Sequence, residues 1–122
     1  QKGVQPTGAL MAAYGVTPWR GVLGRGIAIS DLKDPVQDLA DLTVSLRVDG
    51  QPVDTARGDT LLGNPLDVVL WLVEHGGYEL KPGSVISLGS LGSLHPAHAG
   101  QRIAAVYRVG GRTIEVDLSM VP

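Results

Sequence analysis

Residues 61 to 72 read Leu-Leu-Gly-Asn-Pro-Leu-Asp-Val-Val-Leu-Trp-Leu, and this stretch carries a complete set of helix signals. Asn64 is a favourable N-cap residue, and Pro65 suits the first helical position. The glycine pair Gly76-Gly77 supplies a left-handed stop. Because apolar residues cover most of the circumference, the pattern predicts a helix of about three turns that is buried on nearly all sides. Strands of the same chain or a second subunit would cover it.

Composition limits the classes of protein to which the chain can belong. Its 122 residues predict one domain, residues 1–122. The formal charge of -2 and the lack of a Lys or Arg run argue against a nucleic-acid partner. The sequence has no signal peptide and no apolar stretch of about eighteen residues, which argues against a membrane. The absence of cysteine is consistent with a cytoplasmic protein.

The remaining pattern predicts a mainly β domain of about six strands around the one helix. Seventeen glycines and no Phe favour short strands with tight turns. Asp49-Gly50 and Gly110-Gly111 are two-residue hairpin signals. Gly24 and Gly26 suggest a bulge or a close backbone approach. The strands are expected at Val22 to Ser30, Leu42 to Val48, Val53 to Ala56, Ser84 to Leu88, Ile103 to Val109 and Arg112 to Leu118. Residues 31–41 should form a connection with one helical turn.

A series of short motifs runs through most of the chain in a distinctive order and spacing. They are Val48 to Val53, Arg57-Gly58, Leu62 to Leu66, Trp71-Leu72, Leu80 to Gly83, Gly89 to Gly92 and Ala99-Gly100. From about Ala12 to Leu118, this order resembles the C-terminal half of the fumarylacetoacetate hydrolase superfamily. The similarity is greatest to the branch of 2-hydroxypenta-2,4-dienoate hydratases and 4-oxalocrotonate decarboxylases.

The resemblance implies a distorted β-roll of mixed sheets and an oligomeric enzyme. Enzymes of this family use Mg²⁺ or Mn²⁺, held by three carboxylates, to polarise the keto oxygen of a 2-keto acid and stabilise an enolate. Those carboxylates and the family's lysine lie mostly in the preceding half. Glu74, Glu79 and Glu115 form no Glu-x-Glu pair. We therefore expect no metal ligands from this chain, and Mg²⁺ or Mn²⁺ only if a missing half supplies them.

The departures from the family pattern change the expected pocket. Where the hydratases usually have an Asp-Asn-small-Ser run, this chain has Tyr14 to Thr17, and only Thr17 keeps a hydroxyl. Leu88 replaces a pocket-facing threonine and cannot hydrogen-bond. The candidate catalytic residues are Thr17 and Ser87. The candidate substrate-binding residues are Tyr14, Trp19, Leu88, Gly89, Ser90 and Leu91.

Other polar residues have two possible interpretations each. His95 and His98 have a spacing that could hold a transition metal if a third ligand were near, but two loop histidines are the simpler interpretation. Asp54 and Asp59 could form a polar pocket rim near Arg57, although surface ion pairing accounts for them more simply.

The sequence alone is consistent with three functions. The first is a hydratase- or decarboxylase-like lyase domain acting on a 2-keto (2-hydroxydienoic) acid, incomplete or diverged because the metal carboxylates are absent. The second is a repurposed metal-independent cyclase, isomerase or dehydratase with an apolar pocket. The third is a non-catalytic pseudo-hydratase that binds a partner enzyme. The expected partners are a small-molecule substrate and either further copies of the chain or a complementary hydratase half.

Overall fold

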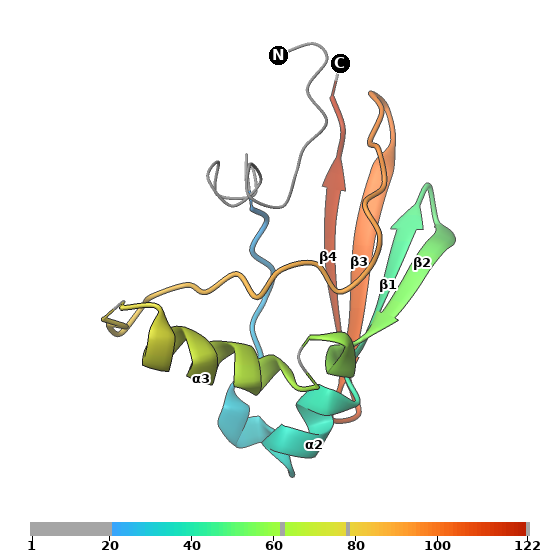
Figure 1. Ribbon diagram of the computed structural model, residues 1–122. Helices are drawn as coiled ribbons and strands as arrows, with labels where there is room; N and C mark the ends of the chain where they lie inside the picture. Colours follow the sequence, from blue (N-terminus) through green and yellow to red (C-terminus); the bar gives the residue numbers. More distant parts are fainter. Residues whose placement is uncertain (1–20, 62, 78, 122) are drawn as a thin grey trace.

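A four-stranded antiparallel sheet flanked by short helices forms the structure, which is a computed structural model that describes residues 21–61, 63–77 and 79–121 (Figure 1). The strand order is β2-β1-β3-β4. In chain order the elements are η1 (Ile29–Asp31), α2 (Pro35–Ala40), β1 (Thr43–Val48), β2 (Gln51–Arg57), η2 (Gly58–Thr60), α3 (Pro65–His75), β3 (Arg102–Val109) and β4 (Arg112–Ser119). The α+β class with a dominant sheet agrees with the sequence prediction.

Two tight hairpins build the sheet. Asp49 and Gly50 join β1 to β2 with φ angles of 50° and 83°, and Gly110 and Gly111 join β3 to β4 with 53° and 75°. Two successive positive φ angles characterise the turn whose twist matches that of paired strands. Both hairpins predicted from the sequence are therefore confirmed. The two hairpins meet where β1 pairs antiparallel with β3.

The β1–β2 hairpin contains a bulge that changes which side chains share a face. Arg47 pairs with Pro52, but Leu46 pairs with Asp54, so Val53 is an extra residue on β2. Val53 is 42% exposed. Without the bulge, Asp54 would oppose Ser45, because a shift of one residue moves a side chain to the other face. The bulge instead aligns Asp54 with Leu46.

One face of the sheet is mainly apolar. Residues directly opposite each other on neighbouring strands project to the same side. Leu46 opposes Ala105 and Asp54, and Ala105 in turn opposes Val116. The backbone at Gly24 crosses this face so closely that an added Cβ would collide with Val116. The predicted close approach is therefore confirmed at Gly24, but it is wrong at Gly26, where an added Cβ would meet nothing within 4 Å.

The helix α3 begins and ends at the residues its sequence signals indicate. Asn64 Oδ1 accepts a hydrogen bond from the Leu66 N–H at 2.9 Å, and Asn64 Nδ2 donates to the Val36 oxygen at 2.8 Å. Asn64 is only 8% exposed and so joins α2 to α3. At the other end, Gly77 has a φ of 65°. The predicted helix is confirmed over Pro65–His75.

Among the described residues, the strands do not bury this helix, so the first of the two expected covers is wrong for this part of the chain. Leu70, Trp71 and Val73 are 57%, 55% and 51% exposed. The physical reason is visible in Figure 1, where α3 lies beside α2 at one end of the sheet and is not enclosed by strands. Covering by a second subunit stays a prediction.

Two predicted strands are also wrong. Residues 22–28 are irregular and lead into η1, and residues 84–88 are irregular as well. The glycines at 24 and 26 allow the first segment to lie across the sheet instead of joining its edge. The described residues therefore contain four strands in an antiparallel sheet, not about six strands in mixed sheets. The expected helical turn within residues 31–41 is confirmed as α2.

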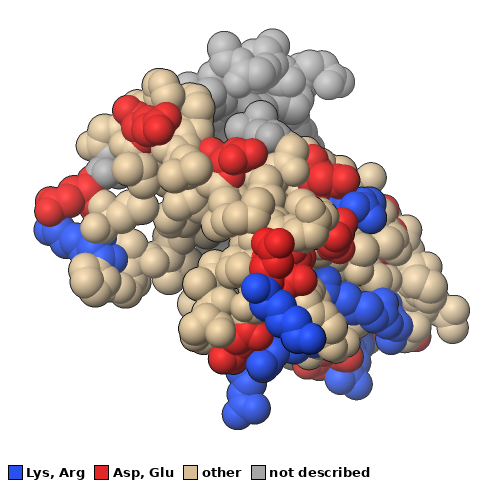
Figure 2. All heavy atoms as spheres, turned by 90° about the horizontal axis from the view of Figure 1, so that it is seen from below, with Lys and Arg blue, Asp and Glu red and all other residues tan. Residues whose placement is uncertain are grey.

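Charged side chains gather around the lower end of the molecule in pairs of opposite sign. Figure 2 shows Lys and Arg lying beside Asp and Glu on this face. Arg57 lies 3.1 Å from Asp41 and 3.2 Å from Asp59, and Arg112 lies 3.3 Å from Asp31. Separately, none of the helices in the described ranges is long and apolar enough to cross a membrane.

Substituting Asn64 with Ala should lower the free energy of unfolding by about 1–2 kcal/mol, because the helix loses its cap and the Val36 oxygen loses its donor. Urea denaturation measures this change. Asn64→Asp is the comparison variant, since it keeps a capping oxygen but replaces the amide donor with a carboxylate oxygen facing the Val36 oxygen. Equal stability of Asn64→Ala and the unchanged chain would contradict the capping role.

Candidate functional site

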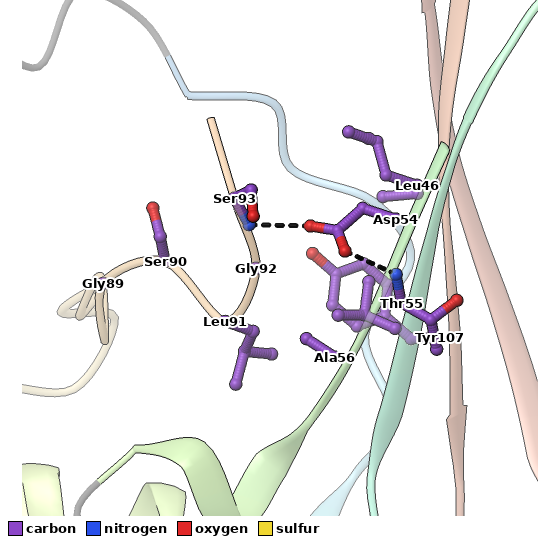
Figure 3. A pocket seen from close by; sticks show the side chains of 12 residues that line it. Leu46, Asp54, Thr55, Ala56, Gly89, Ser90, Leu91, Gly92, Ser93 and Tyr107 are labelled. Atoms are coloured by element: carbon purple, nitrogen blue, oxygen red, sulfur yellow. Dashed lines mark hydrogen bonds between the residues drawn. The ribbon is translucent and has the colours of Figure 1, made fainter. Parts of the chain in front are cut away.

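A pocket of about 280 Å³ lies between the apolar face of the sheet and the glycine-rich segment that follows α3 (Figure 3). The sheet contributes Val44, Leu46, Asp54, Thr55, Ala56, Ala105 and Tyr107, and the loop contributes residues 89 to 93. One wall is therefore formed by side chains of β1, β2 and β3. The other wall is formed by a loop whose glycines leave much of the backbone uncovered.

Asp54 is the polar residue that connects the two walls. Its Oδ2 atom accepts a hydrogen bond from the Ser93 N–H at 2.7 Å, and its Oδ1 atom accepts one from the Thr55 N–H at 2.8 Å (Figure 3). His95 Nε2 lies 3.5 Å from the same Oδ2 atom. A Cβ at position 92 would collide with the Asp54 carboxylate, so glycine is needed there for the loop to approach.

These contacts favour the ionised form of Asp54. The Ser93 N–H lowers the pKa of Asp54 most, followed by the Thr55 N–H, and His95 lowers it further. A carboxylate that accepts backbone N–H bonds loses them in part on protonation. At neutral pH the pocket therefore contains a negative charge on the β2 side.

A second set of contacts holds the loop beside η2. Thr60 Oγ1 donates to the Arg57 oxygen at 2.6 Å and lies 3.5 Å from the Leu91 oxygen. The pairing of Arg57 with Asp59 agrees with the surface ion pair expected from the sequence. The same interpretation is wrong for Asp54, because the bulge turns its carboxylate to the pocket and away from Arg57.

The structure brings together only some of the residues that the sequence indicated for the site. Gly89, Ser90 and Leu91 line the pocket, whereas Ser87 and Leu88 precede the lining segment. Tyr14, Thr17 and Trp19 lie outside the described residues. Their roles stay predictions.

Tyr107 was not predicted from the sequence to line the pocket. For Asp54 a place at a pocket rim was one of two interpretations, and the surface ion pair was the preferred one. Side chains alternate between the two faces along β3, so Tyr107 shares a face with Ala105. This alternation could have identified Tyr107 as a residue of the pocket. No comparable signal existed for Asp54. A regular two-residue hairpin would have placed it opposite Ser45, on the face of the sheet that does not line the pocket.

The described part of the chain does not provide a site for Mg²⁺ or Mn²⁺. No three His, Asp or Glu side chains of residues 21–61, 63–77 and 79–121 gather as a ligand set. His95 and Asp54 lie together, but hard divalent cations require several oxygen ligands. The triad that the resemblance implies cannot be built from these residues.

Comparison with known proteins supports the resemblance. No family model matches the chain. Over 77 residues the chain is 38% identical to a 2-hydroxyhexa-2,4-dienoate hydratase of Comamonas testosteroni, a match that covers 60% of this chain and 29% of the hydratase. The chain thus spans less than a third of that relative.

The structure is similar to that of a 4-oxalocrotonate decarboxylase from Pseudomonas putida G7. The TM-score is 0.63 for its complex with calcium and acetate and 0.62 for its complex with magnesium and adipate. Both matches have 24% identity and cover 80% of this chain, but only 36% and 35% of the decarboxylase. The shared fold and the hydratase match together confirm the resemblance to this branch of the fumarylacetoacetate hydrolase superfamily.

Replacing Asp54 with Asn should release the loop, because the amide group presents a donor where the carboxylate accepts. We expect faster hydrogen exchange at the Ser93 N–H than in the unchanged chain, measured by NMR. Asp59→Asn is the control, since it removes a carboxylate that contacts only Arg57 among the described residues. Unchanged protection of Ser93 in Asp54→Asn would contradict the anchoring role.

The same contact should depend on pH in a defined direction. Because the folded-state pKa of Asp54 is lowered, its stabilising contribution is fully present above the unfolded-state pKa and is lost as the pH falls through the folded value. NMR titration of the Asp54 side-chain carbonyl should therefore show a midpoint below the ordinary aspartate value. The Ser93 amide resonance should move with it. A midpoint above the ordinary value would contradict the geometry.

Proposed function

We propose that this hydratase- and decarboxylase-like chain forms the substrate-binding wall of a lyase that acts on a 2-hydroxydienoic acid or its 2-keto tautomer. The likeness to the hydratase and the decarboxylase supports this class of reaction. The observation that carries the proposal is the pocket between the apolar sheet face and residues 89 to 93. Fold likeness by itself would not transfer an activity, so the pocket chemistry must agree with it.

The two walls suit the two ends of such a substrate. Leu46, Ala105 and Tyr107 offer an apolar surface to the hydrocarbon diene. The ionised Asp54 repels a carboxylate placed beside it. The acid group of the substrate therefore lies toward Gly89 and Ser90, where a glycine-rich backbone and a hydroxyl can donate hydrogen bonds.

If the reaction uses a divalent cation, its carboxylate ligands must be supplied from outside the described residues. A complementary hydratase half is the partner that would provide them. The exposed apolar side chains of α3 support assembly with another polypeptide, either that half or further copies of the chain.

The polar content of the pocket favours the lyase over a cyclase that holds a purely apolar substrate. Ser90 and Ser93 line the pocket with hydroxyl groups. A polar keto acid can hydrogen-bond to these hydroxyls, whereas a hydrocarbon skeleton cannot.

The test is binding and turnover of 2-hydroxyhexa-2,4-dienoate by the natural gene product, together with any polypeptide that co-purifies. Calorimetry measures binding, and loss of the diene ultraviolet absorbance measures hydration. Ala105→Phe should fill the pocket and weaken binding by roughly tenfold or more, since a phenyl ring would overlap the ligand. Ala97→Phe, at an exposed loop position, should bind normally.

Equal binding by Ala105→Phe and the unchanged protein would contradict the assignment of this pocket. A stable complex with another enzyme, but with no binding of the dienoate by either component, would favour the pseudo-hydratase function instead.

A further inference from the structure

We propose that the outer edge of β4 is a docking site for an extended peptide segment of a partner polypeptide, which adds a strand to the sheet. The site is separate from the pocket between the sheet and residues 89 to 93, with which it shares no lining residue. It rests on the backbone of this edge, on a cavity beside the edge and on the charges around that cavity.

The outward-facing backbone groups of β4 have no partner among the described residues. β4 is the last strand in the order β2-β1-β3-β4, and it pairs there with β3 (Figure 1). The Met120 N–H donates to the Gln101 oxygen on the β3 side at 2.8 Å. Because the backbone groups of successive residues point to opposite sides of a strand, those of Thr113 and Glu115 point away from β3. They form an open row of hydrogen-bond donors and acceptors.

The two edges of the sheet differ in how well they can accept a further strand. β2, at the opposite edge, contains Pro52 and the bulge at Val53. Prolines and bulges are features by which natural proteins protect an edge from pairing. β4 has neither, and its eight residues pair with β3 without a shift of register. The β4 edge is therefore regular enough to align with another strand.

A cavity of about 510 Å³ lies beside this edge. It is lined by residues 112 to 115 of β4 and by residues 25 to 27, which belong to the segment that crosses the apolar face of the sheet. Ile27 and Ile114 are half-buried and give the cavity an apolar part. A peptide that pairs with β4 would place one of its side chains against them. Backbone pairing then provides affinity, and the cavity selects the side chain.

The charges around the cavity define the chemistry of the partner strand. Arg112 and Ile114 project to the apolar face, and Glu115 projects to the other face, because side chains alternate along a strand. Asp31 lies 3.3 Å from Arg112, and Arg25 supplies a further positive charge to the cavity wall. An antiparallel partner strand therefore presents a basic side chain opposite Glu115, an apolar one opposite Ile114 and an acidic one opposite Arg112.

A second copy of β4 is a poorer occupant than such a peptide. Since an outward-facing residue can pair only with another outward-facing residue, the possible antiparallel registers between two β4 strands are restricted. The registers with the greatest overlap place Glu115 opposite either Glu115 or Asp117 of the other copy. Like charges directly opposite each other destabilise a strand pair.

The experiment titrates the isotope-labelled full chain with the blocked peptide Thr-Lys-Val-Thr-Glu-Thr and follows backbone amide exchange by NMR. In the free chain the Thr113 and Glu115 N–H groups should exchange rapidly, and at saturation with peptide they should slow by roughly tenfold or more. The Ile114 N–H, which faces β3, is the internal control and should be protected throughout.

Variants of the peptide separate backbone pairing from charge pairing. N-methylation of the Lys and of the Thr that follows Val removes the donors that pair with β4, so binding should weaken by roughly tenfold or more. Replacement of the Lys by Glu places like charges opposite each other at Glu115 and should weaken binding by about threefold.

Glu115→Lys should reverse this preference, so that it binds the Glu-substituted peptide more tightly than the original one. Glu79→Lys makes the same charge change at an exposed position in a turn and should keep the original preference. This pair of variants distinguishes recognition at the β4 edge from a general effect of net charge.

Protection of the Thr113 and Glu115 N–H groups in the free chain at every concentration would show that the edge is already covered and would overturn the proposal. Protection that grows with the concentration of the chain would assign the edge to a second copy instead. Equal binding of the N-methylated peptide, or no response of these amides to any of the peptides, would also contradict strand addition.

Discussion

The contact between the Asp54 carboxylate and the Ser93 N–H is the interaction on which the pocket depends. It joins β2 to a loop separated from it by all of α3 and the irregular chain that follows. The loop forms no strand pairing in the described structure, so its place over the sheet relies on this contact, on the neighbouring Thr60 side chain and on the absence of a Cβ at position 92. Removing the carboxylate would weaken the attachment of the loop to the sheet.

The carboxylate reaches the pocket only because β2 contains one extra residue. Hairpin turn, strand alternation and helix caps are local features, and the sequence predicts them correctly at Asp49-Gly50, Gly110-Gly111 and Asn64. The bulge at Val53 follows Pro52, which has no N–H to donate. Because Pro is also tolerated in a regular edge strand such as β2, Pro52 by itself does not predict the bulge. The sequence therefore favoured a surface ion pair for Asp54, whereas the change of register directs its carboxylate to the pocket.

The burial of α3 is the second property that could not be predicted from the local sequence pattern. An apolar circumference predicts that α3 is covered, but it does not identify what covers it. In this chain the sheet lies to one side, and Trp71 remains more than half exposed. The same limit applies to residues 22–28, where β-branched side chains suggested a strand and the glycines instead let the chain cross the sheet beside Val116. Tertiary packing decides both cases.

The central claim is that the space between the sheet and residues 89 to 93 binds a dienoate. The most direct measurement is an NMR titration of the isotope-labelled protein with 2-hydroxyhexa-2,4-dienoate. This account predicts that the amide signals of Gly89 to Ser93 and Tyr107 shift together with one dissociation constant, while that of Trp71 on α3 does not move. Shifts confined to α3, or no shifts at any ligand concentration, would contradict it.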